Sequence, residues 1–483
     1  MIQPCFMLVQ SLLLAQEPLP VPREAPAPYG PATPIVNYAN ESPEPYPIDL
    51  ATAIRLADSN SPLNVIALAK FRAAVARQDL AELMFVPNFS IGPGYFRHDG
   101  VDQNRRGDVF QVSRSQMYTL GGPSLRVDTA EAIFEPLVRR QQTGAFRESA
   151  RAVRNNTQLA AAVAYFDLLQ VHGRLAVNAE VLQRVSQMLA KAQIADKTGL
   201  SKTKGDVNRS LTELFLRKQE RMDLEGQAGA LAARLAKVLL LPPDTLLVPD
   251  ELKFVPITVV PREKVLEDLV GLAVSNRPEL AASRFMAGSD REKLRLARNQ
   301  PLIPKMQLDY AGGVFGGGKN SYIGDTALRQ DVLLQANWDL RNFGFGNAAM
   351  IRERRAQLEG SLAEVVEIQS QVSAEVTAAA RIAGSRFATL QSAQQAVREV
   401  EELYRKLLAT SFGMFGPRET YDALEPLLAI QEISRVRNLY ITEVTEFNKS
   451  QFTLYMAIGQ PPLEALEGAE YTELSVPPVP PTR

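Results

Sequence analysis

Apolar residues between positions 345 and 410 recur in steps that mostly alternate between three and four. They are Leu358, Leu362, Val365, Val372, Val376, Ala379, Ala383, Leu390, Ala393, Val397, Val400, Tyr404 and Leu407. This spacing is the seam of a coiled coil, and no proline interrupts residues 305–416. At about 1.5 Å per residue, the predicted helix is roughly 100 Å long, more than a globular core covers. The chain must therefore supply partner helices of similar length.

An internal duplication gives both halves of the chain the same predicted architecture. Leu56, Ala57, Asn60 and Pro62 match Leu272, Ala273, Asn276 and Pro278 at a constant offset. In each half we predict a helix of about twenty residues that begins near Pro62 or Pro278. A long helix follows, over about 136–198 or 346–410, and a returning helix ends near Leu240 or Ile458.

Two alternating segments separate the helices in each half and predict strands. Phe89, Ile91 and Tyr95 alternate with small or polar residues, as do Met306, Leu308 and Tyr310, and then Leu334, Ala336, Trp338 and Leu340. Period-two alternation indicates one apolar and one polar face. The segments HDGVDQNRRGD and GGGKNSYIGD are expected to be loops. The remaining strand, over 118–127, loses its phase at Gly121–Pro123, where we expect a bulge.

Four such strands have open edges, which a bilayer does not tolerate. Membrane barrels need about eight strands to close and roughly twelve to surround water. Three copies of the chain would supply twelve. The alternative is a soluble antiparallel sheet packed on helices. The symmetry of the halves and the positions of Tyr95, Tyr118, Tyr310 and Trp338 near strand ends favour the barrel.

Composition limits the remaining possibilities. A net charge of −1 gives no general attraction to nucleic acid, and two histidines with one cysteine, Cys5, leave little for a metal site or disulfides. No phosphate loop, nucleophile elbow or histidine acid–base pair occurs, so we expect no catalysis and no cofactor. No window of about 18 apolar residues predicts a spanning helix.

The expected domain boundaries follow from these patterns. Residues 1–16 form an atypical signal peptide without a basic start, and 17–48 form a proline-rich linker. The two repeats cover 49–241 and 262–460, joined by a proline-rich connector at 242–261. Residues 461–483 are expected to be a disordered proline-rich tail.

The repeated segments also carry a resemblance to a known family. LADSNSPL and LAVSNRPEL, each followed by a proline-led strand (VPNFSIGPGY, IPKMQLDYAG), and the passage ANWDLRNFGFGNAA resemble TolC-type outer-membrane efflux proteins over about 49–460. The resemblance implies an α+β membrane protein with long antiparallel coiled-coil hairpins. Four strands per chain would contribute to a trimeric twelve-stranded β-barrel in the outer membrane, with the helices in the periplasm. It also implies a periplasmic adaptor and an inner-membrane pump as partners.

Candidate functional residues lie at both ends of this architecture. The hairpin turns are expected either to dock an adaptor or only to stabilise the turn; they contain Gly199, Leu200, Ser201, Gly413, Met414 and Phe415. Asp206, Glu419 and Asp422 follow the turns and either form carboxylate rings at a gate or only favour a helix dipole. Pro426 either kinks its helix or begins it.

The strand faces supply the other candidates. The polar residues Lys305, Asp309, Asp339 and Arg341 are expected to line a barrel lumen, where plain solvation explains them as well as a solute site does. The apolar residues are expected to face lipid; they are Phe89, Ile91, Leu308, Tyr310, Leu334 and Trp338. Besides a passive exit duct, a soluble coiled-coil scaffold and a non-conducting outer-membrane tether remain open.

Overall fold

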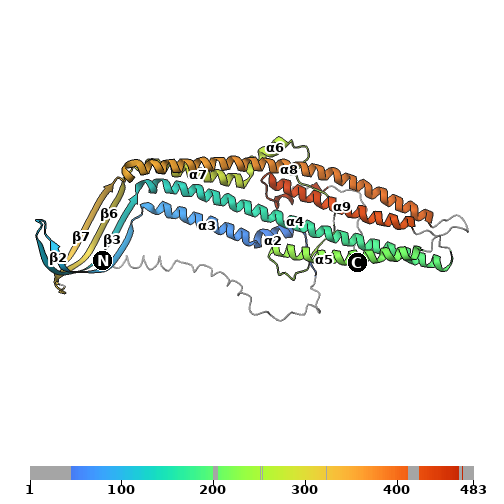
Figure 1. Ribbon diagram of the computed structural model, residues 1–483, viewed down its shortest axis with the longest axis horizontal. Helices are drawn as coiled ribbons and strands as arrows, with labels where there is room; N and C mark the ends of the chain where they lie inside the picture. Colours follow the sequence, from blue (N-terminus) through green and yellow to red (C-terminus); the bar gives the residue numbers. More distant parts are fainter. Residues whose placement is uncertain are drawn as a thin grey trace. The chain divides into compact units, whose positions relative to one another are not determined.

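The computed structural model describes residues 45–199, 205–250, 252, 254–322, 324–411, 424–466 and 470–471. The same order of elements occurs twice in this part of the chain (Figure 1). The first half contains β1 (Tyr46–Ile48), α2 (Leu50–Asn60), α3 (Pro62–Glu82), η1 (Leu83–Phe85), β2 (Asn88–Gln103), β3 (Val109–Asp128), α4 (Thr129–Lys197) and α5 (Asp206–Leu239). The second contains α6 (Leu266–Asn276), α7 (Pro278–Asn299), β6 (Lys305–Lys319), β7 (Gly324–Asn337), η2 (Arg341–Gly344), α8 (Phe345–Ser411) and α9 (Leu424–Ala457).

The long helices form the predicted antiparallel hairpins, α4 with α5 and α8 with α9 (Figure 1). Helices α3, α4, α7 and α8 also pack side by side in that order. The predicted seam of α8 is buried at eight positions: Val372, Val376, Ala379, Ala383, Leu390, Ala393, Val397 and Val400. The predicted start of α4 at Pro136 is wrong, because the helix begins at Thr129. The side chain of the preceding residue, Asp128, accepts a hydrogen bond from Glu131 N–H at 3.2 Å and caps the helix there. Pro136 therefore lies inside α4.

The four long strands form one sheet in the order β2-β3-β6-β7, with every neighbouring pair antiparallel. The strands are longer than predicted because most of each segment that was expected to be a loop is paired. The pairing of β2 with β3 extends to Gln103↔Val109, and that of β6 with β7 extends to Gly317↔Gly324. The bulge expected at Gly121–Pro123 is absent. Gly121↔Gly312 and Ser124↔Asp309 keep one register, while Gly122 and Pro123 have no pairing partner on β6. Proline has no N–H to donate, so the ladder is interrupted without a shift.

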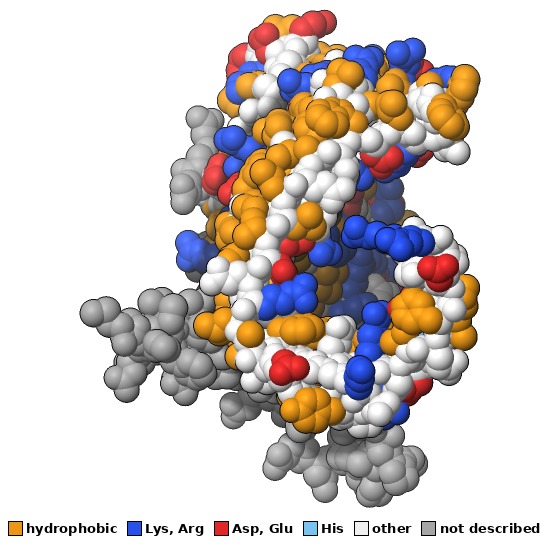
Figure 2. Space-filling view, turned by 90° about the vertical axis from the view of Figure 1, so that its left-hand side faces the viewer, with side chains coloured by type: hydrophobic (Ala, Val, Ile, Leu, Met, Phe, Trp, Pro, Cys, Tyr) orange, Lys and Arg blue, Asp and Glu red, His pale blue; other side chains and the backbone are white. Residues whose placement is uncertain are grey.

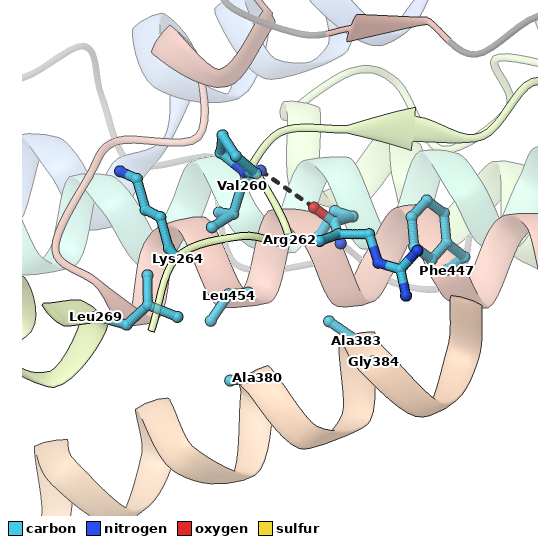
Figure 3. A pocket seen from close by; sticks show the side chains of 11 residues that line it. Val260, Arg262, Lys264, Leu269, Ala380, Ala383, Gly384, Phe447 and Leu454 are labelled. Carbon is cyan, nitrogen blue, oxygen red and sulfur yellow. Dashed lines mark hydrogen bonds between the residues drawn. The ribbon is translucent and has the colours of Figure 1, made fainter. Parts of the chain in front are cut away.

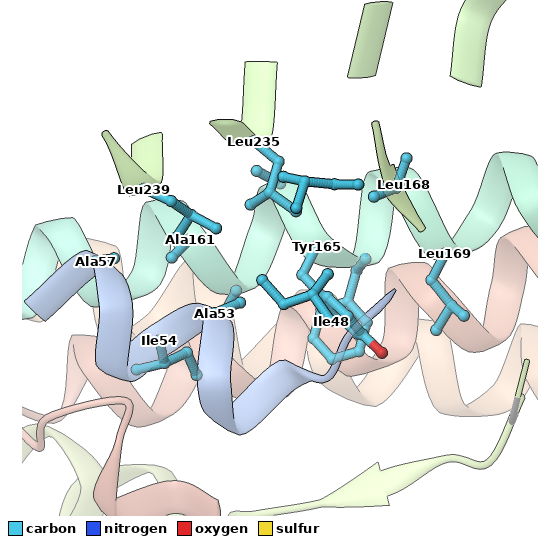
Figure 4. Packing of buried hydrophobic residues seen from close by; sticks show 14 of the residues in the cluster. Ile48, Ala53, Ile54, Ala57, Ala161, Tyr165, Leu168, Leu169, Leu235 and Leu239 are labelled. Atoms are coloured by element: carbon cyan, nitrogen blue, oxygen red, sulfur yellow. The ribbon is translucent and has the colours of Figure 1, made fainter. Parts of the chain in front are cut away.

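The segment between the repeats is more ordered than a linker. Strand β1 pairs in parallel with β4 (Leu247–Pro249), and β5 (Ile257–Thr258) pairs with β8 (Glu470–Tyr471). Ile48 and Leu247 are buried in a core with α2, α4 and α5, where Ile54, Tyr165 and Leu235 meet (Figure 4). The short helix η3 (Glu464–Leu466) joins this core through buried Ala465, and Leu463 N–H donates to Gln158 Oε1 at 3.2 Å.

Ordered structure therefore begins before residue 49 and continues past residue 460, unlike the predicted linker and tail. Residues 1–44 and 472–483 lie outside the described part. The connector also borders a pocket of about 240 Å³ against α8 and α9 (Figure 3). There the Gln451 side chain accepts from Val260 N–H at 3.2 Å, and the Arg262 guanidinium lies 3.6 Å from the Phe387 ring centre. These contacts hold the connector on the second hairpin.

Candidate functional site: a sheet with an uncovered apolar face

One face of the four-stranded sheet is apolar and uncovered. The strand register places large hydrophobic side chains from all four strands on this face, and all of them are exposed: Phe89, Ile91, Tyr95, Met117, Met306, Leu308, Tyr310, Val314, Leu328, Val332 and Leu334. Direct cross-strand pairs such as Leu308↔Leu334 and Tyr310↔Val332 make the surface continuous. Thr119 and Gln330 are polar positions within this face, and beyond Tyr95 the face continues with the charged pair Arg97 and Asp99. The band runs from Met117 to the level of Met306, which is paired with buried Val127, a span of about ten residue steps of about 3.4 Å, or roughly 34 Å along the strand.

The opposite face is mainly polar, and several of its charges are paired. Arg126 approaches Asp309 at 3.5 Å, Lys305 approaches Asp128 at 3.5 Å, and Arg329 contacts Asp331 at 2.9 Å. From Lys305 to Tyr310 on β6, the polar residues are partly exposed, whereas the apolar residues that alternate with them are exposed. The sheet therefore curves with its polar face inward. Figure 2 shows the strands as an arc, with blue and red side chains projecting into the hollow on its inner side.

This arrangement contradicts the soluble alternative of a sheet packed on helices. Such a sheet turns its apolar face toward the helices and its polar face toward water. Here α4 contacts β3 and β6, and η1 contacts β3, but the large apolar side chains named above stay exposed, so no described helix covers the apolar face. The outer strands β2 and β7 are each paired on one side only within the described part of the chain. The sheet therefore has an uncovered apolar surface and two open edges.

The structure brings only two of the four predicted lumen residues onto the polar face. Lys305 and Asp309 lie on β6 as expected. Asp339 and Arg341 do not lie on a strand, because β7 ends at Asn337. Asp339 still reaches Lys305 Nζ at 3.3 Å. Arg341 lies in η2 beside a cavity of about 370 Å³, where its backbone N–H donates to Asn347 Oδ1 at 2.8 Å.

Five of the six predicted lipid-facing residues lie on the apolar face, and Trp338 does not belong to the strand. It follows the end of β7 and is 61% exposed. The chain turns there through positive φ values at Asn342, Phe343 and Gly344. Tyr118 was expected in the aromatic girdle, but its ring covers Gly94 on the polar face.

The hairpin turns lie mostly outside the described residues. These include Leu200, Ser201, Gly413, Met414, Phe415, Glu419 and Asp422. Gly199 has φ +69° directly after the C-cap Thr198, as expected at a helix C-terminus. Asp206 is buried at the start of α5, with Oδ1 at 3.6 Å from Arg209 Nη1. Pro426 is buried in the first turn of the described part of α9, a position that tolerates proline.

Sequence reasoning missed a charge network that joins three helices. Arg437 on α9 contacts Glu401 on α8 at 2.5 Å and also contacts Glu180 on α4. Arg184 on α4 contacts Glu180 and lies 4.7 Å from the Tyr404 ring centre. All four charged side chains are at most 18% exposed. The i,i+4 spacing of Glu180 and Arg184 is visible in the sequence, but the partners on the other helices are not.

Other kinds of site find no support in the described residues. No group of three or more His, Cys, Asp or Glu side chains there could hold a metal ion. None of the helices in the described residues is both long and apolar enough to span a membrane.

Comparison with known proteins gives matches at the level of structure. The sequence matches no protein-family model and none of the curated proteins. Among solved structures, CusC, described with transmembrane channel formation, matches with a TM-score of 0.67 and 16% identity over 90% of this chain and 99% of that one. VceC from Vibrio cholerae, an outer membrane protein, matches at 0.65 and 15% identity over 85% and 96%. The open state of the MtrE outer membrane channel from Neisseria gonorrhoeae matches at 0.65 and 14% identity over 85% and 89%.

These matches cover both halves, so they include the hairpins and the sheet together. The curved sheet with an uncovered apolar face and a paired polar face fits the same architecture. The chain therefore has the fold of the TolC-type outer-membrane channels.

Proposed function

We propose that this protein is the outer-membrane exit duct of an efflux or type I secretion system. Three copies join their sheets edge to edge into a twelve-stranded barrel, and the helices continue it as a periplasmic tunnel. Solutes pass through it passively, driven by an inner-membrane pump that connects through a periplasmic adaptor. The duct contributes a water-lined path and a closable end, and performs no chemistry.

The single observation that carries this proposal is the inverted sheet. Its large apolar side chains are exposed, and beside this apolar band the charges lie on the concave face, where Arg126, Asp309 and Lys305 find partners. An exposed apolar area of this size is costly in water and favourable in lipid. A strand band of roughly 34 Å, tilted by about 40°, spans about 25 Å, the height of an outer-membrane apolar belt.

The open edges of the sheet and of the helix layer support an assembly of several copies. The sheet has unpaired β2 and β7, and the helix layer ends at α3 and α8. The exposed flanks of these helices carry apolar side chains, including Leu80 at 70% and Val366 at 67% exposure. Pairing β7 of one copy with β2 of the next would also cover these flanks. The adaptor and pump rest on the fold likeness alone.

Single-channel recording tests the proposal. Purified protein in a planar lipid bilayer should give uniform current steps whose size follows the bulk conductivity of the salt solution, as a water-filled pore requires. Folded, membrane-inserted protein without current would instead favour the non-conducting tether. Protein that stays monodisperse in buffer without detergent would favour the soluble scaffold.

A further inference from the structure

Besides Phe110 near the tip of the β2–β3 hairpin, three aromatic side chains lie on the polar face of the sheet, where sequence patterning predicts none. Phe96 on β2, Tyr118 on β3 and Phe315 on β6 share this face with Arg126 and Asp309. Tyr118 and Phe315 are directly opposite each other in the register. We call these three residues the aromatic belt. The belt lies farther along the sheet from α4 than the Lys305–Asp128 pair does.

The belt is only partly explained by packing within the sheet. Tyr118 fills the space above Gly94, because a Cβ at that glycine would lie 2.2 Å from the tyrosine ring. Phe315 lies opposite Ala327, which is too small to cover it. Phe96 remains 46% exposed. An aromatic ring on a wall that faces water loses the benefit of burial unless a ligand covers it.

The charge beside the belt is fixed and balanced. The Arg329 guanidinium lies 5.1 Å from the Phe315 ring centre, within cation–π range. Arg329 is held by Asp331 at 2.9 Å, so the pair adds no net charge. The belt therefore offers ring faces and one planar guanidinium without a strong preference for the sign of a ligand's charge.

We propose that the aromatic belt is a binding site on the channel wall for flat aromatic solutes, which stack on Phe96 and Phe315. This inference rests on the proposed function, because it makes the polar face the inner wall of the duct. Beyond the proposed duct, it identifies flat aromatic molecules as solutes that the channel wall retains. A saturated solute of the same size and charge would lack the stacking interaction and pass with less retention.

The test compares naphthalene-2-sulfonate with its decahydro counterpart, which has the same charge and similar size. Saturation-transfer NMR measures binding of each probe to the protein in lipid nanodiscs, with empty nanodiscs as the blank. Single-channel recording measures how much each probe reduces the current. We expect the aromatic probe to act at a concentration about threefold or more lower, as stacking energies of aromatic pairs imply.

Two variants make the test specific. The double variant Phe96→Ser with Phe315→Leu leaves Tyr118 over Gly94, and should abolish the difference between the probes in both measurements. Gln335→Ala on the same face, an exposed residue of β7, is the control and should keep it. Equal behaviour of the two probes with the unmodified protein, or an unchanged difference in the double variant, would overturn the belt proposal. Absence of current before any probe is added would instead contradict the duct, and the NMR measurement would still decide whether the belt binds.

Discussion

Adjacent residues on β6 have opposite surroundings, and this alternation can be tested with one charge. Leu308 is on the uncovered apolar face, and Asp309 beside it lies on the polar face with Arg126 at 3.5 Å. A lysine at mid-bilayer depth costs about 2–4 kcal/mol on the lipid face of a barrel. Leu308→Lys should therefore prevent assembly in the outer membrane. Asp309→Lys should assemble, because Arg126 is largely exposed and the lost pair contributes at most about 1 kcal/mol, and should change ion selectivity.

The amount of heat-resistant oligomer in membrane fractions measures the assembly of the two lysine variants, and bilayer recording measures the ion selectivity of Asp309→Lys. Equal tolerance of both lysines would show that the two faces have been assigned wrongly.

Two glycines on the polar face differ in the space around them. A Cβ at Gly122 would lie 2.1 Å from the carbonyl oxygen of Tyr310, whereas a Cβ at Gly92 would meet nothing within 4 Å. Gly122→Ala should push β3 and β6 apart where Pro123 already interrupts their ladder, at a cost of about 1–3 kcal/mol. Gly92→Ala should have little effect. The melting temperature of the purified oligomer measures both, and a loss in Gly92→Ala as large as in Gly122→Ala would contradict the close approach.

Sequence alone gave the alternation of β6 but not these residue-level details. The position of Tyr118 near a predicted strand end suggests the aromatic girdle, and the glycines and proline at 121–123 suggest a bulge. The register is unbroken there, and only the position of the neighbouring strand reveals this. The partner across a sheet is set by long-range pairing, which local composition does not encode.

At the scale of elements, the helices are joined by buried charges as well as by apolar seams. Arg437 neutralises Glu180 and Glu401 from two other helices, and all three side chains are at most 17% exposed. Arg437→Met leaves two carboxylates close together with only Arg184 beside them, so it should cost about 3–5 kcal/mol. Arg435→Met is the matched control. Arg435 pairs with Glu432 on the same helix with both side chains largely exposed, a contact that contributes at most about 1 kcal/mol.

Chemical denaturation followed by circular dichroism measures the two free energies of unfolding. A similar loss in both variants would show that the network does not connect the helices.

The contact between α2 and α4 should respond to acid. The Arg154 guanidinium donates to Asp58 at 2.6 Å, and this hydrogen bond, opposed by burial and supported by Gln158, lowers the pKa of Asp58. A lowered pKa in the folded state stabilises the fold above the unfolded value of about 3.9, and the contribution is lost as the pH falls through the folded value. Asp58→Asn should therefore be less stable than the unmodified protein at pH 6.

The difference between these two proteins should shrink as the pH falls below about 4. Urea unfolding at several pH values tests this, and a difference that stays constant from pH 6 to pH 3 would contradict the role of the ionised carboxylate.

The elements themselves were predictable because each carries a local signal. Pro62 and Pro278 mark helix starts, and the three-and-four spacing along α8 identifies its buried seam. The predicted ends of the elements were less accurate where two local signals compete. Pro136 suggested a helix start, but the cap at Asp128 determines it. The ordered structure of the proline-rich connector was missed because β1 and β4 pair across slightly more than two hundred residues.

At the scale of the whole molecule, neither layer is complete in one chain. The sheet has the open edges β2 and β7, and the helix layer that continues it has the exposed flanks of α3 and α8. Unpaired strand edges cannot remain open in a bilayer. Two copies would give eight strands and a barrel filled by side chains, whereas three give twelve and leave room for water. The proposed duct therefore requires three chains in the membrane-embedded particle.

That number can be measured directly by native mass spectrometry of the protein reconstituted in lipid nanodiscs. The account predicts a single species of three chains, about three times 53.2 kDa for the full sequence. A particle of one or two chains in lipid, with the sheet intact, would contradict it.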